Sequence, residues 1–397
     1  MPKPRVAIVS PFIDKRHGTE RSIAECIERL SRDYEIHVYS NRVEDLDLNT
    51  ITWHRIPAIS GPHLVAYSWW FVANHLWRWR DRKFRGLIPE IVFSPGINCV
   101  DADVIQVHVV FAQLREHMKQ QLLLRRNPWK TWHEIIHRRI YYSLIAFLER
   151  RIYTRCQVQL VAVSAKTAKD LSHLYSRTRK VQIAYHGIDL ARFQPARRIA
   201  LRSGARRILT LDPGDFAVLL IGNDWKSKGL ACVLNAVGHL QSTAFKILVV
   251  GRDNPEPFQE FIRENGLSSQ VQFLPPRPDV EFYYAAADAY ASPTFEDSFG
   301  LPPAEAMACG LPVITSVLAG VSEIISSGED GFVLEDPSDF QALARILYGL
   351  KNDSELRTQI AAAAVQNASK LTWDDTAEHI RASWELARAA KSAHSLK

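Results

Sequence analysis

The sequence predicts an α/β protein of two domains, each built on an open parallel sheet that helices cover. The composition, 47% hydrophobic and 23% charged, is that of an ordinary globular protein. The chain has 397 residues, which is too long for one core. Short β-branched runs alternate with helical stretches along its length, as in parallel sheets whose strands are joined by helices. A basic, proline-containing stretch without sustained amphipathic periodicity separates the two halves.

Strands are expected where β-branched and aromatic residues cluster between glycine, proline or charged residues. In the first half these are residues 5–12, 35–40, 90–95, 103–110 and 158–164. In the second half they are residues 216–223, 245–251, 271–276, 289–294, 311–316 and 331–335. Such sheets bind ligands at the carboxyl ends of their strands, so we expect two domains that face one another across a cleft.

The domain boundary is predicted from the stretch between the halves. Residues 187–215, "GIDLARFQPARRIALRSGARRILTLDPGD", are the linker candidate, and we place the boundary near residues 195–212. This gives an N-terminal domain of residues 1–200 and a C-terminal domain of residues 201–375. The amphipathic tail, residues 376–397, is predicted to form a helix that can pack back on the N-terminal domain.

Cysteine usage and the N-terminus bear on the cellular compartment. The five cysteines are odd in number, widely scattered and form no CxxC, which argues against a disulfide framework and against a zinc site. The N-terminal "MPKPRVAIVSPF" has an apolar run shorter than a signal peptide needs and no cleavage site. We therefore expect a cytoplasmic protein, because a reducing compartment suits these cysteines.

Charge is distributed unevenly along the chain. Residues 1–200 carry a formal charge of +14 and residues 201–397 carry −8, and seven of the ten tryptophans lie in the first half. Arginine and tryptophan lie together in residues 68–85 and 122–155. Such segments can lie on an anionic membrane surface, with aromatic rings at the interface and cations on phosphates. The protein would then be peripheral on the inner face of the cytoplasmic membrane.

Three other interpretations compete with the membrane surface. The same segments can be core helices whose arginines are simply solvated. A membrane span over residues 56–77 is disfavoured, because Pro57, Gly61, Pro62, His63 and Asn74 interrupt the apolar stretch. Nucleic acid is not an expected partner, because the sequence contains no helix-turn-helix, RNA-recognition or zinc-finger signature.

Two glycine-containing turns between a strand and a helix are candidate anion sites. Gly18 allows close approach of the backbone, Thr19 can cap the helix, and the free amides of the first turn favour an anion. An ordinary capped helix explains this turn equally well. In the second half Gly222 follows a strand, and Lys226 and Lys228 precede a helix, where lysine can neutralise a diphosphate or serve as a solvated loop charge.

A third turn carries two carboxylates, in "EDSFGLPPAE" at residues 296–305. Gly300 and Leu301 would present backbone amides at a helix N-terminus, where the prolines that follow give up donors the helix does not need. A capping role accounts for one acid but less well for both Asp297 and Glu305, which are eight residues apart. Two hydroxyl-rich groups, a hexose and a ribose on either side of a diphosphate, need this arrangement of acceptors around donors.

These motifs resemble those of the family 4 retaining glycosyltransferases, also called group 1 glycosyltransferases, which have the GT-B fold of two Rossmann-like domains. The family signature of two acids separated by seven residues resembles "DSFGLPPAEAMACGLPV", which is followed by "AGVSEIISSGEDGFVL". The segments "HGTER", "VAVSAKTAKDL", "HGIDLARFQP" and "IGNDWKSKG" also resemble family segments, so the resemblance covers nearly the whole chain. "HGTER" and "GRDNPEPF" are similar to segments of lipopolysaccharide core glucosyltransferases.

The sequence departs from the family pattern at three positions. Asp297 replaces the usual first glutamate, and Glu296 lies beside it, so either carboxylate can be the one that reaches the sugar. Asn223 replaces the usual arginine of the phosphate-binding loop, whereas Lys228 is retained, and His186 replaces the usual asparagine.

The resemblance implies transfer of a hexose from a nucleotide-diphosphate sugar to a glycan or lipid-linked acceptor, in polysaccharide or lipopolysaccharide synthesis of the cell envelope. It implies no cofactor and no metal, because cations and helix amides stabilise the charge of the departing diphosphate. The acceptor side lies in the N-terminal domain and the donor side in the C-terminal domain. The implied catalytic residues are His108, Lys228 and Asp297. The implied donor-binding residues are Gly18, Thr19, Asn223, Lys226, Glu296, Phe299, Gly300, Leu301 and Glu305.

Two alternatives remain open at this stage. A non-catalytic protein that binds sugar nucleotides would keep the phosphate loops and lose groups near the sugar, whereas this chain retains both. An epimerase or hydrolase of sugar nucleotides on the same fold differs from a transferase only in its products. His108, at a strand end, is the least specific of the candidates, because a histidine there is more often structural. The base, sugar and acceptor are not encoded in these motifs.

Overall fold

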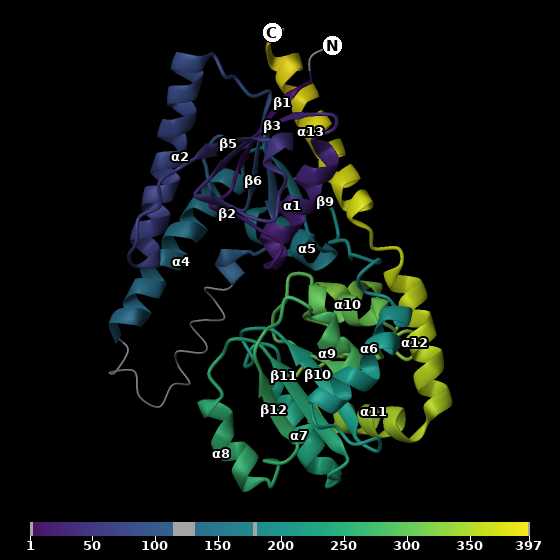
Figure 1. Ribbon diagram of the computed structural model, residues 1–397. Coiled ribbons are helices and arrows are strands. Elements are labelled where there is room, and N and C mark those ends of the chain that lie inside the picture. Colours follow the sequence, from purple (N-terminus) through teal and green to yellow (C-terminus); the bar gives the residue numbers. More distant parts are fainter. Residues whose placement is uncertain (1–2, 114–131, 178–180, 396–397) are drawn as a thin grey trace. The chain divides into compact units, whose positions relative to one another are not determined.

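The computed structural model in Figure 1 describes residues 3–113, 132–177 and 181–395. The chain divides into two compact units. The first runs to Tyr185 and also includes the segment from Trp373 onward, and the second is His186–Thr372. Each unit is an α/β layer structure around its own parallel sheet, which confirms the predicted fold class.

Over its described residues, the first unit holds a seven-stranded sheet of order β5-β3-β1-β6-β7-β8-β9, with every neighbouring pair parallel. The strands are β1 (Arg5–Val9), β3 (Glu35–Ser40), β5 (Thr52–Arg55), β6 (Ile91–Pro95), β7 (Val104–Val107), β8 (Gln159–Ala162) and β9 (Gln182–Ile183). The short strands β2 (Phe12–Ile13) and β4 (Arg42–Val43) pair with each other beside it. The central strands are buried on both faces, as parallel strands require.

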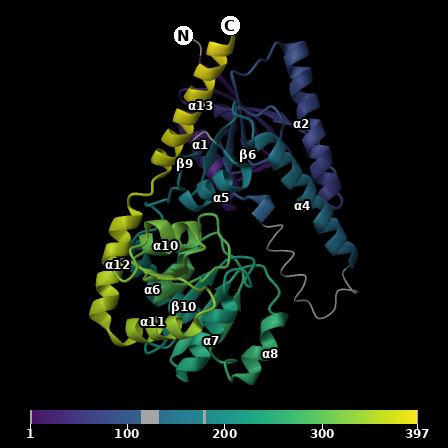
Figure 2. The same ribbon diagram turned by 180° about the vertical axis from the view of Figure 1, so that it is seen from behind.

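Helices cover both faces of this sheet. They are α1 (Gly18–Leu30), α2 (His63–Arg85), α4 (Trp132–Tyr153), α5 (Ala165–Tyr175) and α13 (Trp373–Ser395), with the 3-10 turn η1 (Leu48–Thr50). One core combines apolar residues of α1 and α13 with β1, β3 and β6, and the other combines α2, α4 and α5 with the opposite face. In both views α2 and α4 lie side by side (Figures 1 and 2).

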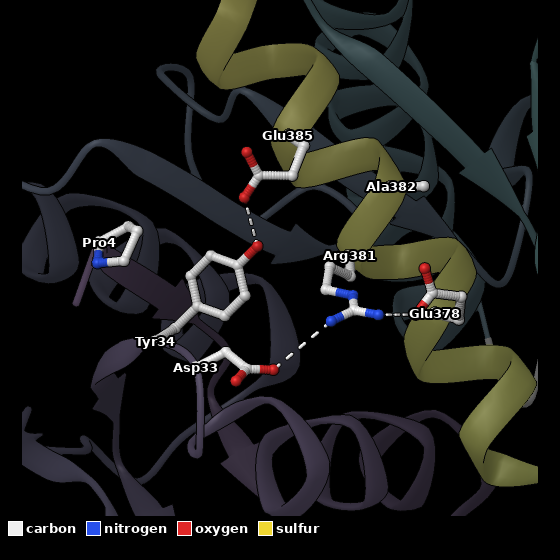
Figure 3. Close-up of a pocket in the computed structure, with 7 residues that line it drawn as sticks. All are labelled: Pro4, Asp33, Tyr34, Glu378, Arg381, Ala382 and Glu385. Carbon is white, nitrogen blue, oxygen red and sulfur yellow. Dashed lines mark hydrogen bonds and ion pairs between the residues drawn. The ribbon is translucent and has the colours of Figure 1, made fainter. Parts of the chain in front are cut away.

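Polar contacts attach α13 to the first unit. A cavity of about 400 Å³ lies between α13 and the turn that follows α1. Figure 3 shows the residues that line it. There Tyr34 donates a hydrogen bond to Glu385 at 2.5 Å, and Arg381 pairs with Asp33 at 3.5 Å. Because these groups bind one another across the cavity, we assign the cavity a structural role in holding the C-terminal helix.

The second unit contains, within the residues described, a six-stranded parallel sheet of order β12-β11-β10-β13-β14-β15. Its strands are β10 (Phe216–Ile221), β11 (Phe245–Val250), β12 (Val271–Leu274), β13 (Ala289–Ala291), β14 (Val313–Ser316) and β15 (Phe332–Leu334). Its helices are α6 (Pro195–Ile208), α7 (Leu230–Leu240), α8 (Glu256–Glu264), α9 (Glu281–Ala286), α10 (Leu301–Ala308), α11 (Phe340–Asn352) and α12 (Ser354–Ala368), with the 3-10 turn η3 (Gly320–Ile324). The core of one sheet face is formed mainly with α7 and α11.

Each predicted strand overlaps an observed one, and the sequence missed only short elements at sheet edges. Strand β5 carries a threonine, a tryptophan, a histidine and an arginine, and its outward residues are exposed. Such an edge strand lacks the continuous β-branched run that identifies buried parallel strands. Strand β9, at the other edge, contains two residues.

The stretch expected to be a linker instead forms α6, which packs on α9 in the second unit. Its basic residues are structural: Arg198, Arg202 and Arg206 recur every four residues and point toward the end of α9. Arg198 and Arg202 donate to the carbonyl of Ala287 at 2.9 and 2.8 Å, and Arg206 contacts Asp288 at 3.1 Å. Burial lowers the pKa of Arg198 to about 10. The sequence does not show the usual apolar periodicity of a helix here, because arginines form the partly buried stripe of α6.

As a result, the two compact units meet in the sequence at Tyr185 and His186, N-terminal to the boundary expected near residues 195–212. The C-terminal helix belongs to the first unit. None of the helices, as far as the chain is described, is long and apolar enough to cross a membrane.

Candidate functional site

The loop after β10 carries the lysines of the candidate site. The chain leaves the strand at Gly222 and enters α7 after Gly229, which has a left-handed φ of +80°. The backbone N–H of Lys228 donates to the carbonyl of Asp224 at 2.8 Å, closing a tight turn. The Cβ that any other residue would add at position 229 lies only 2.1 Å from the Pro293 carbonyl oxygen. Glycine is therefore required here by the close approach of the next loop.

Asn223 holds this loop in place. Its side-chain oxygen accepts a hydrogen bond from the backbone N–H of Arg252 at 3.0 Å. The backbone N–H of Trp225 donates to the Asp253 carboxylate at 2.9 Å. Both contacts join the loop after β10 to the loop after β11. The amide of Asn223 thus acts as a tie between two loops, whereas Lys226, three residues further on, is exposed.

The loop after β13 carries the acids. It is joined to the lysine loop by two bonds to the Ser227 carbonyl, from the Phe295 N–H at 2.7 Å and from the Thr294 hydroxyl at 2.9 Å. The loop ends at Gly300, which has a φ of +98° and precedes the first turn of α10. This turn begins with Leu301, and because Pro302 and Pro303 carry no N–H, the donors available here are the backbone N–H groups of Gly300 and Leu301.

Lys228 and Asp297 form an ion pair, with the lysine Nζ 2.5 Å from the aspartate Oδ2. Each side chain is about one fifth exposed, so the pair is reached by solvent. The structure therefore shows which of the two adjacent acids approaches Lys228: it is Asp297. The backbone N–H of Glu296 is held in the turn by the Thr294 hydroxyl at 3.3 Å.

Glu305 lies on α10 and is buried. It accepts a hydrogen bond from the Tyr284 hydroxyl at 2.8 Å. Burial raises the pKa of Tyr290, a residue of β13, and the nearby charges of Asp297 and Glu305 add to that shift. Both carboxylates therefore lie within electrostatic reach of one buried tyrosine, which places them in the same part of the second unit.

The remaining predicted residues lie where the sequence suggests turns or strand ends. Gly18 is the first residue of α1, followed by Thr19, and His108 follows β7 and is buried. These three belong to the first unit, whereas all other predicted site residues belong to the second. Phe299 is buried against the ring of His186, with centroids 5.3 Å apart.

Sequence reasoning missed Asp14, which orders the turn before α1. Its Oδ1 accepts from the backbone N–H groups of Arg16 at 2.8 Å and His17 at 3.1 Å. These bonds, together with the His17 side chain, hold the pKa of Asp14 below its ordinary value although burial acts to raise it. An aspartate two residues before an exposed backbone N–H is a known turn signal, and it was available in "FIDKRHG".

The described residues contain no group of three or more His, Cys, Asp or Glu side chains placed to hold a metal ion. What the second unit offers is one lysine, two carboxylates and a helix N-terminus at the carboxyl ends of β10 and β13. These groups suit a ligand with both anionic and hydroxyl-bearing parts.

The protein thus has two Rossmann-like units, and the second carries a candidate site for a ligand with anionic and hydroxyl-bearing parts. Residues 16–192 match the sequence profile of glycosyltransferase family 4, and residues 202–367 match that of the glycosyl transferases group 1. The chain belongs to this glycosyltransferase family.

Curated relatives include D-inositol 3-phosphate glycosyltransferases. The protein of that name from Thermomonospora curvata is 33% identical over 242 residues, which are 56% of this chain and 55% of the relative. The one from Rhodococcus erythropolis is 31% identical over 242 residues, 58% of this chain and 54% of the relative. The chain thus spans about half the length of the curated relatives it matches.

Solved structures share the GT-B fold over nearly the whole chain. WaaG, a glycosyltransferase involved in lipopolysaccharide biosynthesis, superposes with a TM-score of 0.75 at 21% identity, covering 95% of this chain and 98% of that one. HepE of Anabaena, in complex with UDP-glucose, superposes with a TM-score of 0.71 at 17% identity, covering 96% and 99%. At these identities the likeness is one of fold.

We expect Gly229→Ala to destabilise the second unit and displace Lys228. The added Cβ has to fit against the Pro293 carbonyl at a backbone φ that alanine adopts poorly, at a cost of about 2 kcal/mol or more. The matched control is Gly238→Ala on the same helix, α7, where the nearest atom lies 3.7 Å away. Thermal melting should show a clear loss for the first variant and a small gain for the second, because alanine favours helices. Equal melting temperatures would contradict the packing described here.

Proposed function

We propose that this protein is a retaining glycosyltransferase that moves a hexosyl group from a nucleotide-diphosphate sugar to a glycan or lipid-linked acceptor of the cell envelope. The observation that carries the proposal is the Lys228–Asp297 pair beside the first turn of α10. Family membership supports transfer to an acceptor. The involvement of WaaG in lipopolysaccharide biosynthesis supports an envelope acceptor.

The chemistry follows from charge. The bond between the anomeric carbon and the diphosphate oxygen breaks, and its electron pair leaves with the diphosphate. Lys228 and the backbone N–H groups of Gly300 and Leu301 stabilise the charge that develops on the leaving group. The acceptor hydroxyl forms the new bond to the anomeric carbon and gives up its proton. Retention of configuration is part of the proposal through family resemblance.

The other residues have roles that fit their positions. Asp297 accepts hydrogen bonds from hydroxyls of the transferred sugar, and Glu305 accepts them from the ribose. Binding of the donor draws Lys228 from Asp297 to the diphosphate, which carries more negative charge than one carboxylate. His108, in the first unit, contacts the sugar or positions the acceptor, and Gly18 and Thr19 supply backbone and hydroxyl donors.

A panel of sugar nucleotides tests the proposal. Ligands that bind the native state raise its melting temperature, so UDP-, GDP-, ADP- and dTDP-sugars are screened by thermal shift. The sugar nucleotide that stabilises the protein is then incubated with glycan and lipid-linked acceptors, and the products are analysed. A glycosylated acceptor supports the transferase. Free sugar or an epimerised nucleotide identifies a hydrolase or epimerase, and binding without turnover identifies a non-catalytic protein.

We expect Lys228→Ala to lower donor binding or turnover by about two orders of magnitude, because one charged contact contributes a few kcal/mol. Lys226→Ala, on the same loop but with an exposed side chain, should cost less. Both proteins should keep the wild-type melting temperature, since a partly exposed ion pair adds little stability. Steady-state kinetics with the donor from the screen measure the difference. Wild-type kinetics in folded Lys228→Ala remove this lysine from the mechanism.

We also expect Asp297→Asn to lose more activity than Glu296→Gln. The uncharged amide cannot form an ion pair with Lys228, and it replaces an anionic acceptor for sugar hydroxyls by a neutral one. A loss of about tenfold or more in kcat/KM is expected for the first variant and a smaller change for the second. If only Glu296→Gln is inactive, the assignment of the acid is off by one residue.

We further propose that α2 and α4 form a docking surface for anionic lipid. Exposed apolar residues recur along one side of α2, at Val65, Val72, Leu76 and Trp79, and end in a basic turn. Exposed apolar residues also follow one side of α4, which lies beside α2 (Figure 2). An apolar stripe flanked by cations is the pattern of helices that lie in a membrane interface.

The contacts of the basic residues on α2 bear on which of them can face such a surface. Arg78 is only 9% exposed and binds Asp101 through both terminal nitrogens. Arg80 and Arg85 pair with the buried carboxylate of Asp81 at 3.1 and 3.4 Å. Arg80 and Arg85 are exposed as well, but Asp81 offsets part of their charge, so we take Arg82 and Lys83, which are exposed and do not pair with Asp81, as the cations to test. The cluster of Arg125, Arg126 and Lys130 beside Trp129 lies outside the described residues.

Replacing Arg82 and Lys83 by glutamine should weaken binding to vesicles of phosphatidylglycerol and phosphatidylcholine on the order of tenfold, because each basic residue near an anionic surface contributes about 1 kcal/mol. The control replaces two exposed arginines of the second unit, Arg207 and Arg345, by glutamine. Co-sedimentation at low salt measures binding, and added salt should reduce it. If binding to neutral vesicles is equally strong, or survives the first pair of substitutions, the docking surface is refuted.

A further inference from the structure

Tyr284 is a fully buried residue of α9 whose hydroxyl lies against the first turns of α10. The hydroxyl oxygen is 2.8 Å from Glu305 Oε2 and 3.1 Å from the carbonyl oxygen of Pro302. A phenol has one hydrogen to donate, and a bond to a charged acceptor is the stronger of the two. Tyr284 therefore donates chiefly to the carboxylate.

The phenol remains a donor throughout the physiological range. Burial raises the pKa of Tyr284 well above its ordinary value, and the nearby charge of Glu305 adds to the shift. A donor of this kind is what a buried carboxylate requires, because an ionised group away from water is stable only when it is hydrogen-bonded.

Tyr284 is itself held rigidly, because α9 is fixed at both ends. At its first residue, Glu281 pairs with Arg192 at 2.6 Å and with Arg197 at 2.8 Å. At its last turn, the arginines of α6 bind the backbone carbonyls. The ring of Tyr284 also packs edge-on against buried Phe193, with centroids 5.7 Å apart. A six-residue helix is too short to be rigid alone, so these contacts define where the hydroxyl lies.

We propose that Tyr284 is a positioning residue, which orients the Glu305 carboxylate toward the ribose hydroxyls of the donor. The inference rests on the proposed function, in which Glu305 accepts hydrogen bonds from the ribose. A glutamate has three side-chain torsions, and a fixed donor on one oxygen selects one orientation of the group before the ligand arrives. Binding then pays less ordering entropy, and the acceptor geometry is set in advance.

The same helix supplies a matched control. Tyr283 is also buried, and its hydroxyl donates to a backbone carbonyl, that of Pro275, at 2.6 Å. Tyr283→Phe and Tyr284→Phe therefore each remove one buried phenol hydrogen bond from α9. Only the second removes a bond to Glu305, so a difference between the variants in ligand binding reports on that carboxylate.

The test uses calorimetric titration of the full chain with UDP and with 2′,3′-dideoxy-UDP, which lacks the ribose hydroxyls. If the screen above selects another base, the matching diphosphate and its dideoxy form replace them. Tyr284→Phe should weaken binding of the ribose form about tenfold, the usual effect of losing a hydrogen bond to a charged group. Its binding of the dideoxy form should match wild type. Tyr283→Phe should bind both ligands as wild type does, and both variants should melt at similar temperatures.

The outcomes separate this inference from the proposed function. If wild type binds no nucleoside diphosphate, the donor assignment fails and the inference falls with it. If wild type binds the ribose and dideoxy forms equally, the ribose role of Glu305 fails together with the inference, whereas the donor assignment stands. If wild type prefers the ribose form and Tyr284→Phe keeps that preference, only the inference is overturned. An equal loss on both ligands also overturns it, because the tyrosine then acts on the fold of the site as a whole.

Discussion

The parallel arrangement of β10 and β13 is the constraint on which the candidate site depends. Neighbouring parallel strands have their carboxyl ends on the same side of the sheet, so the loops that follow them meet although they are distant in sequence. In these loops the Nζ of Lys228 lies 2.5 Å from the Oδ2 of Asp297. The glycine at position 229 is a consequence, because the two loops approach too closely there for any side chain. The ion pair is thus a consequence of the strand order.

A second constraint comes from the cost of burying charge. The buried acids Glu281 and Glu305 and the partly buried Asp288 lie in or next to α9 and α10, and each has a donor from another element. Arginines of α6 and of the preceding loop supply the first two, and Tyr284 supplies the third. Because an unpaired buried carboxylate costs several kcal/mol, the arginine contacts fix α9 relative to α6, and the Tyr284 bond joins α9 to α10. The geometry around Glu305 therefore depends in part on α6, whose arginines hold α9.

Sequence patterns predicted most of the strands and singled out the two loops of the second unit in which Lys228 and Asp297 lie, and they failed where the deciding partner lies far away in the chain. Strands such as β10 and β11 are continuous apolar runs, which need no distant information. The stripe of arginines on α6 looked like a charged linker, because nothing local indicates that backbone carbonyls of α9 receive it. Tyr284 lies in "FYYAAADAYA", where an aromatic residue is expected to be core, and its hydroxyl partner is 21 residues away.

The contact of Asn223 with the loop after β11 explains what this residue does at the position where the family usually has arginine. The asparagine ties the loop after β10 to the loop after β11 through the Arg252 N–H, so the position has become structural. Lys228 is then the cation held by Asp297 at the strand ends, with Lys226 exposed beside it. In the proposed mechanism, fewer fixed cations leave more of the stabilisation of the diphosphate to the backbone N–H groups of Gly300 and Leu301, since Pro302 and Pro303 have none. Backbone donors do not change charge with pH, whereas the lysine must first be released from its aspartate.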